Sequence, residues 1–117
     1  MGFNMRTSKL FVYGQLKPGS KYHAHSILKP QKATIRAELH DLGKDVGAKK
    51  IGKTSKTGNG YIVTIPTTKL HYFDKIEKPQ FERIKTKTTN NQEVWVYKYL
   101  KNVSKRDKII KNFKVKK

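Results

Sequence analysis

The segment FERIKTKTTNNQEVWVYKYL, residues 81–100, is the feature that most constrains the fold. Two runs within it alternate apolar and polar residues, which is the period of a strand with one buried face. The turn-like stretch TTNNQ separates them, and Asn90 and Asn91 tolerate the positive φ angles that tight turns use. The sequence therefore predicts an antiparallel hairpin late in the chain.

Three earlier segments also have strand patterns, and each ends at a glycine or a proline. They are LFVY at 10–13, which stops at Gly14, ATIRAELHDLG at 33–43, and GYIVTIP at 60–66. In the second of these, the residues predicted to face inward are Ile35, Ala37 and Leu39. Residues 44–60 carry four glycines and five lysines and are predicted to be a mobile loop or a hairpin tip.

Two segments have helical patterns. In KLHYFDKIEK, residues 69–78, the apolar side chains share one helical face, and Thr68 is the predicted N-cap. In SKRDKIIKNF, residues 104–113, Ser104 and Asp107 have capping-box spacing. A further helical turn is predicted within 22–28. The predicted inward residues are Leu70, Phe73 and Ile76 in the first helix, and Ile109, Ile110 and Phe113 in the second.

The order of these elements predicts an α+β fold. A chain of 117 residues suits a single domain, here a small mixed β-barrel or curled sheet with flanking helices. We predict that the domain covers residues 1–103 and that a basic C-terminal helix or tail covers 104–117.

The charge is unusual, because 27 Lys and Arg against 8 Asp and Glu give a net charge of +19. Such a field attracts nucleic acid and other polyanions. Only four of the basic residues are arginines, which favour specific phosphate and base recognition, so the lysines also fit a compositional bias. Both interpretations stay open. The tail KNVSKRDKIIKNFKVKK, with eight basic residues and one acid, is the predicted element for weak, non-specific nucleic-acid binding.

Other classes of site have little support. The chain has no cysteine, which excludes disulfides and thiolate metal sites. His23 and His25 have no third ligand at a persuasive spacing, so no metal site is predicted. GAKKIGKT, residues 47–54, formally matches a P-loop but lacks the strand before it and the helix after it. No segment has the length of a membrane span or the pattern of a secretory signal, so we expect a cytoplasmic protein that does not enter membranes.

Three ordered segments resemble the gamma-glutamylcyclotransferase-like family. LFVYGQLKPG is similar to its first strand and the following Y-G-[ST]-L, and AELHDLG to its middle strand. GNGYIVTIPTTKLHYFDKIE is similar to G-E-L-Y-x-V followed by a helix with L-D-x-x-E, and the 81–99 hairpin to the family's closing Y-x-R hairpin. The resemblance covers roughly residues 9–100.

The resemblance implies a site and a reaction. Tyr13, Gly14, Gln15 and Leu16 would line an anion site for the α-carboxylate of a small γ-glutamyl compound, and Glu77 would be the general base. Gly14 lets a ligand approach the backbone, and successive amides form an anion nest. The implied enzyme, of acyltransferase or lyase type, would release 5-oxoproline and an amine without a metal or organic cofactor.

The sequence departs from the family pattern at four positions. Gln15 replaces Ser or Thr, Asn59 an acid, Gly60 a leucine and Phe81 a tyrosine. These departures leave a second hypothesis open, that of a non-enzymatic basic module that uses the same fold to bind a polyanion or a protein partner. Asp74, three residues before Glu77, is expected to brace the helix rather than to react.

Overall fold

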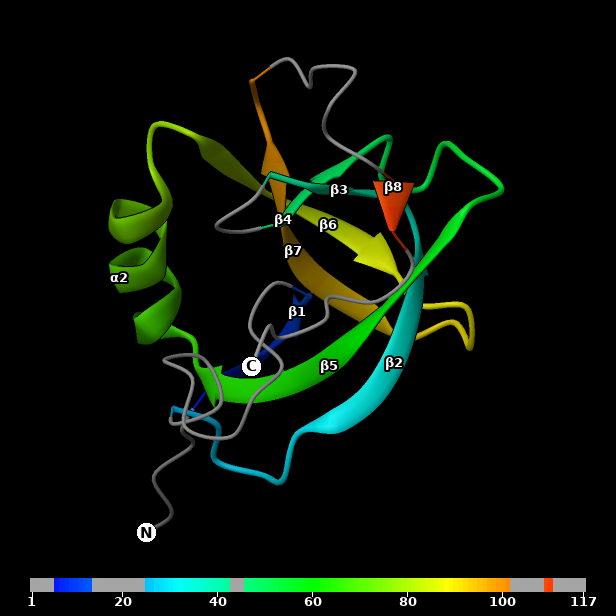
Figure 1. Ribbon diagram of the computed structural model, residues 1–117. Helices are drawn as coiled ribbons and strands as arrows, with labels where there is room; N and C mark the ends of the chain where they lie inside the picture. The colour runs from blue at the N-terminus through cyan, green and yellow to red at the C-terminus, as the bar shows by residue number, and fades with distance from the viewer. Residues whose placement is uncertain (1–5, 14–24, 43–45, 102–108, 111–117) are drawn as a thin grey trace, which may run out of the picture.

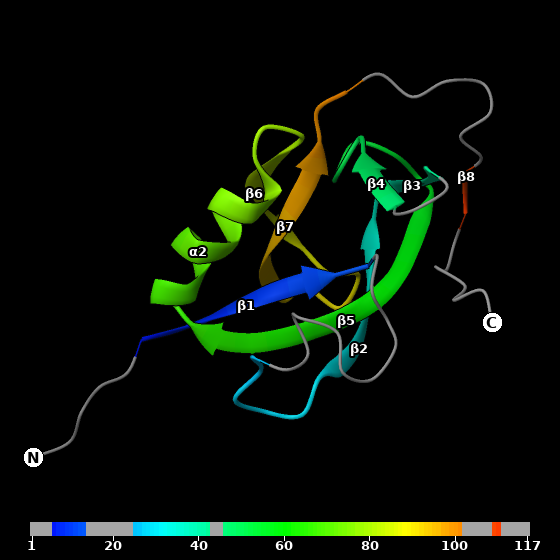
Figure 2. The same ribbon diagram turned by 60° about the vertical axis from the view of Figure 1, so that its left-hand side comes forward.

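The fold is a curled mixed sheet with a helix, α2 (Thr68–Glu77), packed against its outer face (Figures 1 and 2). The computed structural model describes residues 6–13, 25–42, 46–101 and 109–110, and the statements below concern these residues. The predicted α+β class and the barrel-like sheet are confirmed.

Eight strands form the sheet within the described residues. Their order is β2-β5-β1-β7-β4-β3-β8. Strands β1 and β4 pair with different parts of one edge of β7, and β6 pairs with its opposite edge. The pairings of β7 with β1 and with β4 are parallel, and the other pairings are antiparallel. The strands are β1 (Thr7–Val12), β2 (Gln31–Arg36), β3 (Glu38–Asp41), β4 (Val46–Lys49), β5 (Thr57–Pro66), β6 (Phe81–Lys87), β7 (Glu93–Tyr99) and β8 (Ile109–Ile110), and the helix is α2 (Thr68–Glu77).

The sheet curls until β2 meets the turn of the β6–β7 hairpin. Ile35 pairs with Thr88 in an isolated β-bridge, and the Thr89 N–H donates to the Thr34 carbonyl at 2.8 Å. These contacts join the first strand in the sheet order to a hairpin near its middle, which gives the sheet its barrel-like shape (Figure 1).

The core has two parts, one on each face of β1. Neighbouring side chains of a strand point to opposite faces. Phe11 therefore lies inside the curled sheet, while Leu10 and Val12 pack between the sheet and α2. On the helix side they meet Leu70 and Phe73. A strand that buries both faces needs a continuous apolar run, which explains the LFV segment.

Several sequence predictions are confirmed by this architecture. The hairpin forms where predicted, and Asn91 in its turn has φ 71°. The first strand is confirmed over residues 10–12 but begins three residues earlier than predicted, at Thr7. Ile35, Ala37 and Leu39 are all buried.

Other predictions are wrong in detail. The predicted 33–43 strand is divided at Ala37 into β2 and β3, and the predicted 44–60 loop contains β4. The sequence does not show strand β4 because it contains Gly47, which lacks a side chain and is not typical of a strand. Only glycine fits there, since the Tyr99 ring lies 2.7 Å from where a Cβ would be. Ile109–Ile110 pairs with β3 as a strand rather than forming a helix.

The helix is also corrected at both ends. Ile76 is 44% exposed, because α2 buries only Leu70 and Phe73 against the sheet. The N-cap is Thr67 rather than Thr68, and its hydroxyl group pairs with that of Ser8 at 2.8 Å instead of capping the helix. The predicted helical turn at 22–28 lies partly outside the described residues, and its described part, 25–28, is not helical. No helix in the described ranges is long and apolar enough to span a membrane.

Candidate functional site

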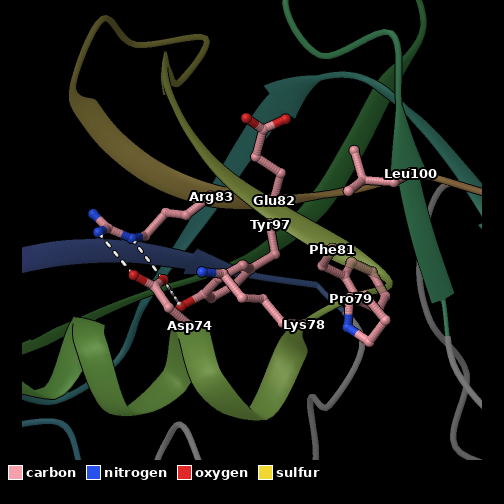
Figure 3. Close-up of a pocket in the computed structure, with 8 residues that line it drawn as sticks. All are labelled: Asp74, Lys78, Pro79, Phe81, Glu82, Arg83, Tyr97 and Leu100. Atoms are coloured by element: carbon pink, nitrogen blue, oxygen red, sulfur yellow. Dashed lines mark hydrogen bonds and ion pairs between the residues drawn. The ribbon is translucent and has the colours of Figure 1, made fainter.

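Asp74, Arg83 and Tyr97 form a hydrogen-bonded cluster between α2 and the β6–β7 hairpin (Figure 3). Arg83 donates from Nε to Asp74 Oδ1 at 2.8 Å and from Nη2 to Oδ2 at 3.0 Å. The Tyr97 hydroxyl donates to Asp74 Oδ1 at 2.8 Å. Bidentate pairing of this kind fixes orientation as well as charge. The cluster therefore ties α2 to both strands of the hairpin.

The local sequence explains how the three side chains meet. Phe73 is fully buried against the sheet, so its neighbour Asp74 is turned to the edge of the helix contact. Arg83 and Tyr97 are opposite each other in the β6–β7 ladder and share the face that looks toward α2. The guanidinium carbon of Arg83 also lies 4.3 Å from the centre of the Trp95 ring, which limits its movement further.

Electrostatics keep Asp74 ionised and Tyr97 protonated. Burial is the largest influence on Asp74 and raises its pKa, but hydrogen bonds from Arg83 and Tyr97 and the charge of Arg83 outweigh it, so the pKa is lowered overall. Burial, followed by the hydrogen bond to Asp74 and its negative charge, raises the pKa of Tyr97. A carboxylate with a lowered pKa is a weak proton acceptor, so Asp74 braces the helix, as expected from the sequence.

A cavity of about 580 Å³ opens beside this cluster. Its size is in the range of small-molecule sites. Lys78, Glu82 and Arg83 supply charged groups, and the apolar part of the wall comes from Pro79, Phe81 and Leu100 (Figure 3). The polar groups of Asp74 and Tyr97 complete the lining.

Glu77 is the last residue of α2, one turn after Asp74, and is partly buried. Its negative charge contributes to the raised pKa of Tyr97, which puts the two side chains within electrostatic reach. It is not among the residues that line the 580 Å³ cavity, whose wall at this end of the helix begins at Lys78. Gly14, Gln15 and Leu16 lie outside the described residues, so their approach to Glu77 stays a prediction.

Tyr13 sits where β1 and β4 divide one edge of β7 between them. Leu10 of β1 is opposite Trp95, and Ala48 of β4 is opposite Lys98. The buried Tyr13 hydroxyl donates to the Tyr97 carbonyl at 2.6 Å and accepts from the Ala48 N–H at 3.2 Å. It thereby bridges the gap between the two strands and fixes the point at which the chain leaves the sheet.

The described residues contain no cluster of three His, Asp or Glu side chains that could hold a metal ion. His23, one of the two histidines considered above, lies outside the described residues. The formal P-loop match is not a phosphate loop, because Gly47 is buried within β4.

Comparison with known proteins decides the family. A sequence model described as Gamma-glutamyl cyclotransferase, AIG2-like matches residues 10–113. The chain belongs to this family. Curated protein sequences contain no significant match.

Solved structures agree with the family assignment at the level of the fold. An AIG2-like protein (ggact) from Mus musculus has a TM-score of 0.71 at 15% identity, with 92% of this chain and 88% of that chain covered. The uropathogenic E. coli-specific protein c4763 has a TM-score of 0.71 at 15% identity, with 92% of this chain and 90% of that chain covered. The uncharacterized protein PH0828 from Pyrococcus horikoshii has a TM-score of 0.63 at 15% identity, with 89% of this chain and 86% of that chain covered.

Three of the departures from the family pattern have structural explanations. At Gly60, a Cβ would overlap the carbonyl oxygen of Val12 and lie 2.7 Å from Phe11 Cζ, so the Phe11 ring fills this space. Asn59 accepts a hydrogen bond from Thr34 Oγ1 at 2.7 Å. Phe81 lines the cavity, and its ring centre lies 5.3 Å from that of Tyr99. The fourth, Gln15, lies outside the described residues.

Arg83 and Tyr97 belong to the cluster but are not predicted as site residues by the sequence. The only sequence signal for them was the resemblance to the closing hairpin of the family, in which an arginine and a tyrosine recur. Their joint contact with Asp74 depends on how α2 lies across the hairpin, and spacing along the chain does not predict that.

Proposed function

We propose that the protein is a gamma-glutamylcyclotransferase that converts a small γ-glutamyl amine or γ-glutamyl amino acid into 5-oxoproline and the free amine, with Glu77 as general base. The observation that carries the proposal is the position of Tyr97. Its carbonyl holds Tyr13 at the start of the predicted anion loop, and its hydroxyl holds Asp74, one helical turn before Glu77. One residue thus links the two segments on which the family resemblance rests.

The reaction is an intramolecular aminolysis. Glu77 takes a proton from the α-ammonium group of the γ-glutamyl moiety, and the freed amine attacks the γ-carbonyl carbon. A five-membered ring closes as the new C–N bond forms. The original amide C–N bond then breaks as Glu77 passes its proton to the departing nitrogen. The second proton that the ring nitrogen loses on becoming a lactam N–H also goes to the released amine, which leaves as an ammonium ion. No water is consumed.

The other residues bind and orient in this proposal. The loop of Tyr13, Gly14, Gln15 and Leu16 would hold the α-carboxylate through backbone N–H groups, which keeps the amine aimed at the γ-carbonyl. The ion pair of Asp74 with Arg83 holds the C-terminal turn of α2 in place, and with it Glu77. General-base catalysis requires that the carboxylate lie within hydrogen-bond reach of the ammonium group.

The test is substitution of Glu77. We expect Glu77→Gln to fold normally and to lose 5-oxoproline formation by about 10²–10⁴-fold, because an amide of nearly the same shape does not accept the proton. Mass spectrometry of 5-oxoproline with a panel of γ-glutamyl compounds measures the rate and also identifies the leaving amine. Glu93→Gln, at an exposed position of β7, removes the same charge and should leave the rate unchanged.

Undiminished turnover by Glu77→Gln would remove Glu77 from the mechanism. If the unmodified protein forms no 5-oxoproline from any compound of the panel, the cyclotransferase reaction itself is wrong.

A further inference from the structure

A second hollow, of about 420 Å³, lies at the seam where the sheet closes. We call it the seam groove. Three parts of the chain meet there: Arg36 at the end of β2, Gly52 in the β4–β5 connection, and the β6–β7 hairpin turn, which contributes residues 86–89 and Asn91. The Gly52 N–H donates to the Arg36 carbonyl at 2.8 Å, and the Thr89 N–H to the Thr34 carbonyl. The walls are therefore fixed by backbone hydrogen bonds.

The lining of the seam groove is polar and positively charged. It contains the guanidinium of Arg36 and the ammonium of Lys87, three threonines and an asparagine, and no carboxylate. Neither cation forms an ion pair among the described residues, although Glu93 is opposite Lys87 in the ladder. Two cations that face one hollow without a counter-ion repel each other, and an anion between them relieves that repulsion.

Hydroxyl donors are also available in the seam groove. Within the described residues, Thr86 and Thr89 use their hydroxyl groups in no hydrogen bond, whereas that of Thr88 is engaged with Asn90 and with the backbone of Gln92. Free hydroxyl groups beside a guanidinium and an ammonium match the several acceptor oxygens of a phosphate group. A carboxylate has only two oxygens and would leave donors unused.

We propose that the seam groove binds a phosphate group, carried either by a small phosphorylated molecule or by the backbone of a single-stranded nucleic acid. No aromatic ring lines the groove to stack a base, so binding would rest on phosphate contacts and would depend little on nucleotide sequence. The groove and the cavity beside Asp74 share no lining residue, so the two sites are separate. The sequence predicts such binding for the tail at 104–117, of which the structure describes only 109–110.

To test this, the full chain is titrated with sodium tripolyphosphate at constant ionic strength. Binding is measured by isothermal titration calorimetry and by changes in amide chemical shifts. We expect saturable binding, with the largest shifts at Gly52, Asn91 and residues 86–89. The double variant Arg36→Gln/Lys87→Gln should bind at least about tenfold more weakly, because both charge-assisted hydrogen bonds are lost. Both side chains are exposed, so the fold should persist, which a thermal melt checks.

The matched control is Lys32→Gln/Lys75→Gln, which removes the same charge from exposed positions on β2 and α2. It should weaken binding less than twofold. Equal weakening in both double variants would mean that only the overall field of the protein acts, and it would overturn the proposal. So would the absence of saturable binding, or shifts centred on other residues.

A second titration with oligothymidylate distinguishes the two sources of phosphate. If the oligonucleotide binds and the seam variant loses that binding, the ligand is a nucleic-acid backbone. If only tripolyphosphate binds and the seam variant loses it, the ligand is a small phosphorylated molecule. Either outcome supports the groove as a phosphate site, and neither depends on 5-oxoproline formation.

Discussion

The hydroxyl group of Tyr13 stands where two strands share one edge of a third. Without this hydroxyl, the Tyr97 carbonyl and the Ala48 N–H would each lose the partner that they have between β1 and β4. One phenol satisfies both, as acceptor and as donor. This explains why the apolar run LFV ends in a tyrosine and not in another aliphatic residue.

The Tyr13 contacts predict a loss of stability in Tyr13→Phe. The ring still fills its place inside the sheet, but two buried backbone groups lose their partner, which costs about 1–3 kcal/mol. Urea denaturation of the two proteins measures the difference in the free energy of unfolding. Tyr72→Phe is the control, because that side chain is 53% exposed and its loss should matter little. Equal effects of the two substitutions would mean that the bridge contributes nothing.

Asp74 gives a prediction with a definite pH dependence. Its pKa is lower in the folded protein than in the unfolded chain, so folding favours the ionised carboxylate. The stabilisation is fully present above the ordinary Asp pKa of about 3.9 and is lost as the pH falls through the lower folded value. We expect Asp74→Asn to be about 2 kcal/mol less stable than the unmodified protein at neutral pH.

The difference in the free energy of unfolding between the unmodified protein and Asp74→Asn should become smaller below about pH 4, because the Asp74 carboxyl group then becomes protonated. Chemical denaturation at a series of pH values measures it, with Glu93→Gln as the control for loss of an exposed acid. A gap that stays constant down to the acid limit would show that the Asp74 charge does not contribute.

At the scale of elements, glycines decide how closely β1 and β5 approach each other. Gly60 lies against the Val12 carbonyl, which cannot move without disturbing the β1–β5 ladder, and against the buried Phe11 ring. Gly58 faces only the end of the Leu39 side chain, whose atoms lie 2.6 Å from the position of a Cβ. The Val12 backbone beside Gly60 can therefore move less than the Leu39 side chain beside Gly58.

We therefore expect Gly60→Ala to destabilise the protein by about 2–3 kcal/mol, and Gly58→Ala to cost less, because a side chain repacks more easily than a paired backbone. Thermal and urea unfolding of the two variants tests the order. If Gly58→Ala is the more damaging, the Val12 contact does not limit the approach of the strands.

The elements that could be predicted from the sequence are those with local signals. The hairpin carries alternation on both sides of a turn that Asn91 accommodates, and Phe73 marks the buried face of α2. Strand β4 was missed because Gly47 and Ala48 have too little side chain to show alternation. Strand β8 is a two-residue pairing with β3, and only distant contacts create it. The cluster of Asp74 with Arg83 and Tyr97 was missed for the same reason.

At the scale of the whole molecule, the family assignment and the net charge bear on different properties. The family match covers residues 10–113 and accounts for the fold around α2 and the hairpin. The charge of +19 explains none of the packing, because the buried residues are almost all apolar. It acts instead through self-repulsion, which opposes the compact state.

Self-repulsion predicts that salt stabilises this protein. The screening length falls from about 30 Å at 0.01 M to about 8 Å at 0.15 M ionic strength, so repulsion between lysines on different faces is largely removed over this range. We expect the melting temperature to rise by several degrees between these salt concentrations, measured by scanning calorimetry. A variant with Lys32, Lys56, Lys75 and Lys101 changed to Gln, all of them exposed, should melt higher at low salt and gain less from added salt. A melting temperature that does not change with sodium chloride would mean that the positive charges are already spaced too widely to repel.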